Sequence, residues 1–161
     1  MVEMQELQLP GYAFKIRTSP QGEQIFDTVR KKYIFLTPEE WVRQHFINFL
    51  VEHRQCPVSL MKVESGIKWN GMDMRSDIVV HDRNGKPLAI VECKAPNVPI
   101  SSSTFEQIFR YDRVLNAEYL LLTNGNDHYC CQLDRTEKSF KPLKEIPVYA
   151  EMIFGCKASD P

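Results

Sequence analysis

The sequence predicts an α/β fold with a mixed sheet, in a single domain that spans residues 1–161. Two observations carry this prediction. Helical and strand patterns alternate along the chain, and two of the strand patterns are continuous apolar runs. Such continuous runs are typical of strands that are buried on both faces. The strand–helix–strand passage between the two runs favours a parallel pairing. We expect the core to span about residues 30–135.

Start and stop signals set the order of the elements. Thr37 can cap a helix and Pro38 suits its first position, while Glu40 has the spacing to close a capping box. Ser103 and Glu106 repeat that spacing at a second helix start. The predicted elements are a helix from Thr37 to about residue 53, strands Pro57–Val63, Arg75–His81 and Pro87–Lys94, a helix from Ser101, and strands Tyr119–Thr123 and Asp127–Leu133.

Turn residues define the connections. Asn84-Gly85 predicts a tight hairpin between the second and third core strands, and Asn124-Gly125 predicts another turn before the last strand. Before the core, residues 9–36 hold short apolar stretches separated by turn residues, which indicates an N-terminal strand or hairpin decoration. The segment Ile146–Tyr149 could pack back on the domain or mediate a contact.

Composition excludes several classes of protein. The net charge is −1, so nucleic acid would have to bind through a local patch or a bridging metal. No apolar run approaches the roughly 18 residues that span a bilayer, and no hydrophobic signal region is seen, so we expect a cytoplasmic protein without a membrane partner. The five cysteines lack C-x-x-C spacing and are expected to be free, buried thiols.

Charged groups at two apolar strands carry the functional hypothesis. Glu92 and Lys94 point the same way in a strand, and Asp77 on a neighbouring strand can lie beside them. Two carboxylates suit Mg²⁺, with Mn²⁺ as the alternative ion, and the Cys93 carbonyl is a further ligand. Such an ion activates water, and Lys94 can orient that water or neutralise phosphate, which points to phosphodiester hydrolysis. The competing interpretation is an ordinary surface Glu–Lys pair.

Two helical features add to this site. Gln107 and Tyr111 are four residues apart, so one helix face can present both to a phosphate or a catalytic group. Glu39 falls on the inward stripe of the first helix, an unusual place for a carboxylate that is neither paired nor metal-bound. Glu40 lies near the edge of that stripe, and the favourable interaction of a carboxylate with the dipole at the helix N-terminus accounts for its presence there.

Taken together, these motifs resemble the PD-(D/E)xK nuclease superfamily. More narrowly, they are similar to the N-terminal nuclease domain of type I restriction enzyme R subunits, in the small standalone form found in bacteria. The residues that carry the resemblance are Thr37–Gln44, Arg75–Val80, Lys86–Pro96, Gln107–Tyr111 and Leu122–Gly125. The resemblance covers most of the chain and implies a restriction-endonuclease-like αβββαβ core. Ser76 stands where the family name has proline.

The resemblance also implies roles for single residues. Asp77 and Glu92 would bind Mg²⁺ and Lys94 would be the catalytic lysine. Gln107 and Tyr111 would support the active site and DNA. A glutamate of the first helix often completes the metal site, and Glu39 is our choice, with Glu40 as the alternative. Basic residues available for a phosphate track are Lys62, Lys68, Arg75, Lys94, Arg110 and Arg113.

One departure concerns partners. No G-x-x-x-x-G-K-[ST] motif occurs, so this sequence holds no ATP-driven motor, and partner proteins would supply a motor or DNA specificity. Cutting both DNA strands usually takes two sites, which a homodimer would provide.

Three hypotheses follow. The first is a magnesium-dependent endodeoxyribonuclease. The second is a non-catalytic DNA-binding or protein-interaction module of a defence or repair complex. The third is an α/β domain with an accidental E-x-K, for which Asp77 and Glu92 would lie more than about 8 Å apart, too far for one ion to bridge.

Overall fold

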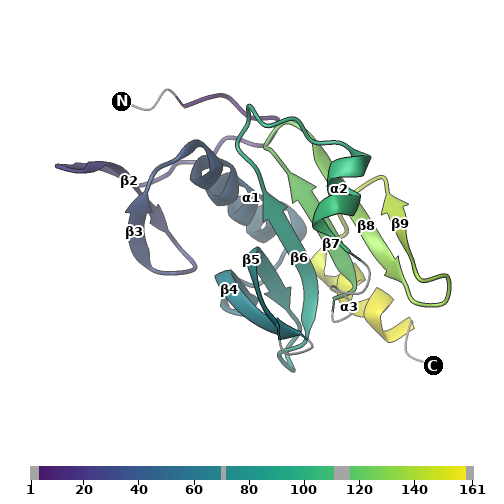
Figure 1. Ribbon diagram of the computed structural model, residues 1–161. Coiled ribbons are helices and arrows are strands. Elements are labelled where there is room, and N and C mark those ends of the chain that lie inside the picture. The colour runs from purple at the N-terminus through teal and green to yellow at the C-terminus, as the bar shows by residue number, and fades with distance from the viewer. Residues whose placement is uncertain (1–3, 70–71, 111–116, 159–161) are drawn as a thin grey trace.

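The computed structural model describes residues 4–69, 72–110 and 117–158, of which residues 65–69, 72–74 and 156–158 are described by their backbone alone (Figure 1). A six-stranded sheet forms the centre, in the order β4-β5-β6-β7-β8-β9. Only the β6–β7 pair is parallel, so the predicted mixed sheet is confirmed. Its strands are β4 (Met61–Trp69), β5 (Met72–His81), β6 (Pro87–Cys93), β7 (Tyr119–Thr123), β8 (His128–Asp134) and β9 (Ser139–Leu143).

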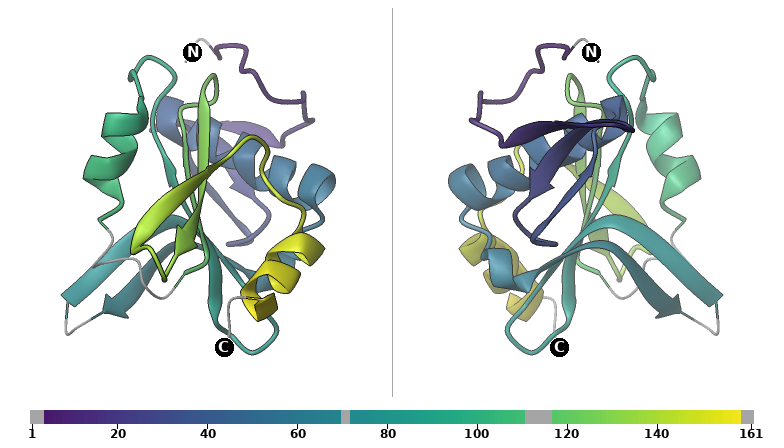
Figure 2. Two further views of the ribbon diagram at one scale, coloured as in Figure 1. Left: turned by 90° about the vertical axis from the view of Figure 1, so that its right-hand side faces the viewer. Right: turned by 90° about the vertical axis from the view of Figure 1, so that its left-hand side faces the viewer.

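Helices cover both faces of this sheet. Helices α1 (Pro38–Arg54) and α3 (Tyr149–Ala158) lie on one face, and the short α2 (Ser102–Ile108) lies on the other (Figure 2). Alternate residues of β7 therefore enter two cores: Leu121 packs with Phe46 of α1, while Leu120 packs with Phe105 of α2. This burial on both faces explains the continuous apolar runs. None of the described helices is both long and apolar enough to cross a membrane.

A second, three-stranded antiparallel sheet precedes α1 and confirms the predicted N-terminal decoration. It consists of β1 (Ile16–Ser19), β2 (Gly22–Asp27) and β3 (Lys32–Phe35). Ile25 of β2 is fully buried, and the fully buried Asp27 accepts a hydrogen bond from Gln44 of α1 at 3.0 Å. An apolar side chain and a buried carboxylate thus fix this sheet against the helix.

Several element bounds differ from the prediction. The residues before β4 form a 3-10 turn, η1 (Val58–Leu60), and the strand runs on to Trp69, so the first core strand was predicted too early and too short. The cap of α2 is Ser101, which exchanges hydrogen bonds with Thr104, whereas the prediction named Ser103 and Glu106. The predictions did not include β9 and α3.

Half of the predicted capping box on α1 is present. Thr37 accepts a hydrogen bond from the Glu40 N–H at 3.1 Å, but the Glu40 carboxylate turns inward to arginine partners and does not return to the cap. The C-terminal segment packs back on the domain, since the Tyr149 hydroxyl donates to the His81 carbonyl at 3.0 Å. The predicted free, buried thiols are confirmed at Cys56, Cys93, Cys130 and Cys131.

Gly125 supports a first testable prediction. Its φ is +87°, and a Cβ there would lie 2.8 Å from Leu7 Cδ2. Gly85 has a similar φ of +83° with open space around it. We expect Gly125→Ala to lower the free energy of unfolding by about 2–3 kcal/mol, against about 1 kcal/mol for Gly85→Ala, because only the first adds a steric contact to the backbone strain. Urea denaturation measures both, and equal losses would contradict a tight fit around Leu7.

Candidate active site

Two carboxyl groups of the sheet lie side by side. Asp77 of β5 precedes the antiparallel pair Ile78–Val91, which places it beside Glu92 of β6. Asp77 Oδ2 also accepts a hydrogen bond from the Cys93 N–H at 2.8 Å. Burial raises the pKa of Glu92, and the hydrogen bond and negative charge of Asp77 act in the same direction, so that the pKa lies at about 9. The third hypothesis, in which the E-x-K pattern is accidental, requires Asp77 and Glu92 to lie far apart, and the fold instead places them next to each other.

Lys94 approaches the same pair from the end of β6. Its backbone N–H donates to the Thr123 carbonyl at 2.8 Å, which extends the β6–β7 pairing by one residue and fixes the start of the side chain. The positive charge of Lys94 lowers the pKa of Glu92, against the effects of burial and of Asp77. The lysine therefore lies close enough to act electrostatically on the carboxyl pair.

Arg43 of α1 is a member of this site that the sequence reasoning missed. The side chain is buried, with 4% of the residue exposed. Its Nη2 lies 2.7 Å from Asp77 Oδ1, and its Nη1 donates to Glu40 Oε2. The spacing of Arg43 from Glu39 and Glu40, four and three residues, is typical of helical ion pairs and was the available signal. Nothing in the local pattern indicates its reach across to Asp77.

The two glutamates in the first turn of α1 have the opposite burial from the prediction. Glu40 is buried, with 6% exposed, while 47% of the Glu39 side chain is exposed. Arginine partners explain the burial of Glu40, because Arg30 Nη2 lies 2.8 Å from its Oε1 and Arg43 holds its Oε2. Burial still raises the pKa of Glu40, against the opposing effects of Gln44 and these arginines. The expectation that Glu39 faces inward is wrong.

Glu39 nevertheless lies next to the carboxyl pair. Its Oε1 is 3.4 Å from Arg43 Nη2, the same nitrogen that contacts Asp77. The negative charge of Glu39 is also among the influences that raise the pKa of the Cys93 thiol, after burial and Asp77. Glu39 is thus at the solvent side of the site, whereas Glu40 belongs to the buried ion pairs behind it.

The remaining predicted residues, which are the Cys93 carbonyl, the Gln107–Tyr111 pair and the basic residues, differ in their exposure and partners. The Cys93 side chain is buried, and the role of its carbonyl as a metal ligand stays a prediction. Gln107 is exposed in the last turn of α2, and Tyr111 lies outside the described residues, so their shared face stays a prediction. Arg75 pairs with Glu64 at 2.8 Å. Arg110 is exposed. The side chain of Lys68, and Arg113, are outside the described part of the chain.

The donor set fits a hard divalent ion. Among the described residues, no group of three or more His, Cys, Asp or Glu side chains converges as a ready-made metal cage. Asp77 and Glu92 instead offer a pair of oxygen donors, and burial together with the neighbouring Asp77 raises the pKa of Glu92, so a bound cation would favour its ionised form. Mg²⁺ suits such a pair because it retains several waters and takes one or two carboxylates.

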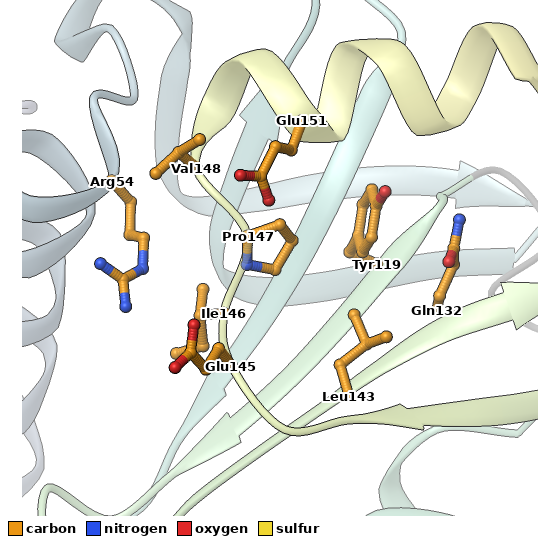
Figure 3. Close-up of a pocket in the computed structure, with 9 residues that line it drawn as sticks. All are labelled: Arg54, Tyr119, Gln132, Leu143, Glu145, Ile146, Pro147, Val148 and Glu151. Carbon is orange, nitrogen blue, oxygen red and sulfur yellow. The ribbon is translucent and has the colours of Figure 1, made fainter.

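A separate cavity of about 340 Å³ lies between the end of α1, the strands β7–β9 and the start of α3 (Figure 3). Arg54 and Glu151 face it from the two helices, and Tyr119 and Gln132 face it from the sheet. It contains none of the predicted site residues, so the carboxyl pair is the better candidate for chemistry.

Comparisons with known proteins agree with the fold. The chain resembles a fragment of a protein described as an HsdR subunit of a type I restriction enzyme from Vibrio vulnificus YJ016, with a TM-score of 0.54 and 19% identity. That match covers 76% of this chain and 26% of the other, so the chain spans about a quarter of that fragment. No curated protein matches significantly. The family model described as Type I restriction enzyme R protein N terminus (HSDR_N) matches residues 38–147. The chain therefore belongs to the family of type I restriction enzyme R protein N-terminal domains, with a restriction-endonuclease-like fold.

Proposed function

We propose that this protein is a magnesium-dependent endodeoxyribonuclease that hydrolyses DNA phosphodiester bonds. The observation that carries the proposal is the contact between the Asp77 and Glu92 carboxyl groups, with Lys94 close by. This is the donor arrangement that a phosphodiester hydrolase needs, and the family is that of a restriction enzyme subunit.

Each side chain has a distinct role in the proposal. Asp77 and Glu92, with the Cys93 carbonyl, would hold Mg²⁺ or Mn²⁺, and Glu39 would add a carboxylate from the solvent side. The bound ion supplies activation of water and neutralisation of phosphate charge. Lys94 orients the attacking water and stabilises negative charge on the phosphate. Arg43 holds Asp77 Oδ1 and so fixes the direction of that carboxylate.

The binding of Mg²⁺ by Glu92 requires loss of its proton. A raised pKa means that the metal-free carboxyl holds that proton at neutral pH. Metal affinity should therefore increase with pH. Partner proteins that supply specificity or a motor would bring the DNA to this site, since no motor motif occurs in residues 1–161.

A cleavage assay tests the proposal. Purified protein should cut DNA when Mg²⁺ or Mn²⁺ is added and should be inactive with a chelator; single-stranded, double-stranded and branched DNA are compared. Lys94→Ala should reduce the rate on the order of 10²-fold or more, because the lysine acts on the reacting groups. Lys141→Ala, an exposed lysine of β9, is the control and should cut normally.

Two results would overturn the proposal. One is cleavage that persists unchanged in both Lys94→Ala and Asp77→Asn, which would place the activity elsewhere or in a contaminant. The other is the absence of Mg²⁺ binding by calorimetry even with DNA present. That second result would favour the alternative, a non-catalytic DNA-binding or protein-interaction module on the same fold.

A further inference from the structure

The exposed face of the N-terminal sheet concentrates aromatic rings and cations. The register pairs Phe26 with Tyr33 and Gln24 with Phe35, so these side chains share one face. Arg17 is opposite Gln24 and so belongs to the same face. Lys15 is two residues before Arg17, and because side chains alternate along a strand it lies on that face as well. We call this set, Lys15, Arg17, Phe26, Tyr33 and Phe35, the outer face. Figure 2 (right) views the sheet with α1 behind it.

The outer face is open to solvent. Phe35 is 51% exposed, an unusual position for a phenylalanine, and it has no ring contact among the described residues. Arg17 and Lys15 are also exposed. The opposite face of the sheet is the one that packs, since Ile25 is fully buried there. The packing of the domain therefore does not account for the rings on the outer face.

Charge is segregated across this sheet. Glu23 and Asp27, the carboxylates of β2, alternate with Gln24 and Phe26 and so belong to the opposite face. Within residues 15–35, all of which are described, the outer face has two cations and no carboxylate. The chain as a whole has a net charge of −1, so this is a local positive patch in an otherwise balanced protein.

Rings and cations are also arranged as a unit. The Arg17 guanidinium lies 3.9 Å from the centroid of the Tyr33 ring and donates to Gln24 at 2.8 Å, which fixes its plane over the aromatic face. Lys15 Nζ lies 5.7 Å from the centroid of the Phe26 ring. A flat guanidinium over a ring offers both charge for a phosphate and a plane for a base.

The outer face lies close along the chain to the candidate active site. Phe35 ends β3 two residues before Thr37, the cap of α1, and Glu39 follows in the first turn. The β2–β3 turn carries Arg30, which contacts Glu40 at 2.8 Å, and Glu40 in turn pairs with Arg43 beside Asp77. The family match begins at residue 38, so this sheet lies outside it.

We infer that the outer face binds an unpaired nucleic-acid strand. Phosphates contact Lys15 and Arg17, and a base stacks on Phe35, as the chemistry of these side chains allows. An unpaired strand fits better than a duplex, because its bases are free to stack. This inference rests on the proposed function for the identity of the substrate, and it adds a preference for single-stranded segments next to the site.

Binding without cleavage tests the inference. The Lys94→Ala protein is titrated with a labelled thymidine oligonucleotide of about 20 nucleotides in EDTA, and affinity is read by fluorescence anisotropy. Phe35→Ala should weaken binding about fivefold or more. Arg17→Ala should also weaken binding and lower the slope of log K against log salt by about 0.7, the value for one phosphate contact on a single strand.

Matched variants provide the controls. Phe154, 74% exposed on α3, and Arg83, an exposed residue of the β5–β6 turn, are replaced by alanine and should bind normally. Thermal unfolding of each variant confirms that it is folded. The duplex of the same sequence should be affected less by Phe35→Ala than the single strand.

Three results would overturn the inference. The first is an unchanged single-strand affinity in both outer-face variants, and the second is an equal loss of affinity in the Phe154 and Arg83 controls. The third comes from a parallel titration with poly-glutamate: if the outer-face variants lose binding to poly-glutamate but keep their affinity for the single strand, the occupant is an acidic peptide. Because no metal or catalysis is involved, the outcome is separate from the nuclease proposal. A protein that binds through this face but never cuts would contradict only that proposal.

Discussion

Replacing Glu92 with glutamine should abolish DNA cleavage and, in the same variant, raise thermal stability above pH 7. Cleavage should fall on the order of 10³-fold or more, because the substitution removes a charged ligand of the proposed metal site. Stability should increase because the wild-type carboxyl is buried beside Asp77, where its ionised form is unfavourable. Opposite effects on activity and stability are expected of a functional side chain whose burial lowers the stability of the fold.

The sign of the pH dependence follows from the raised pKa of Glu92, about 9 against 4.5 for the ordinary group. The protonated carboxyl contributes stability that is fully present below about pH 4.5 and is lost as the pH rises through about 9. Glutamine does not titrate. The variant should therefore match the wild type near pH 5 and exceed it by at least ~1 kcal/mol at pH 8 in metal-free buffer.

Thermal melts at pH 5 and pH 8, with and without Mg²⁺, measure this difference. Added Mg²⁺ should stabilise the wild type and leave Glu92→Gln unchanged. Glu137→Gln, at an exposed position, is the control for a general effect of removing one negative charge. A Glu92→Gln protein less stable than the wild type at pH 8 would contradict the unfavourable contact with Asp77.

Arg43→Met should lower the free energy of unfolding by about 3–5 kcal/mol, because Asp77 loses its arginine and the buried Glu40 keeps only Arg30. Arg75→Met provides a matched control. Both arginines contact Glu64, at 3.4 Å for Arg43 and 2.8 Å for Arg75, but their side chains are 5% and 71% exposed. The exposed pair should contribute no more than about 1 kcal/mol.

Chemical denaturation of the two variants, with the wild type alongside, gives both values. Similar losses in the two variants would mean that Arg43 is no more tightly coupled to its partners than a surface arginine. A double variant that also changes Glu40 to glutamine should recover part of the stability lost in Arg43→Met, because the uncompensated buried charge is then removed.

The sequence was sufficient for the core fold and for the proximity of Asp77 and Glu92. Apolar runs such as Leu88–Val91 specify strands buried on both faces, and the single polar positions at their ends identify Asp77 and Glu92. Helix start signals also placed α1 within a residue of its start at Pro38. These features are local, because each depends on periodicity or on a short turn.

What the sequence could not provide depends on distant partners. Glu40 is buried because Arg30, ten residues earlier and on another element, reaches it, and no helical periodicity contains that information. The same limitation hid the contact between Arg43 and Asp77, which are 34 residues apart. Strand β9 and helix α3 were missed because their patterns are weak: β9 is largely exposed, and Phe154 of α3 is exposed.

The position of both carboxylates on one hairpin has a consequence for folding. Asp77 and Glu92 are 15 residues apart and belong to adjacent antiparallel strands, so little loop-closure entropy separates them. A β-hairpin forms on the order of 1–10 μs, well before a parallel pair such as β6–β7 can close. The two carboxyl groups therefore meet early, and the free energy needed to bury Glu92 beside Asp77 must come from the slower, non-local half of the sheet.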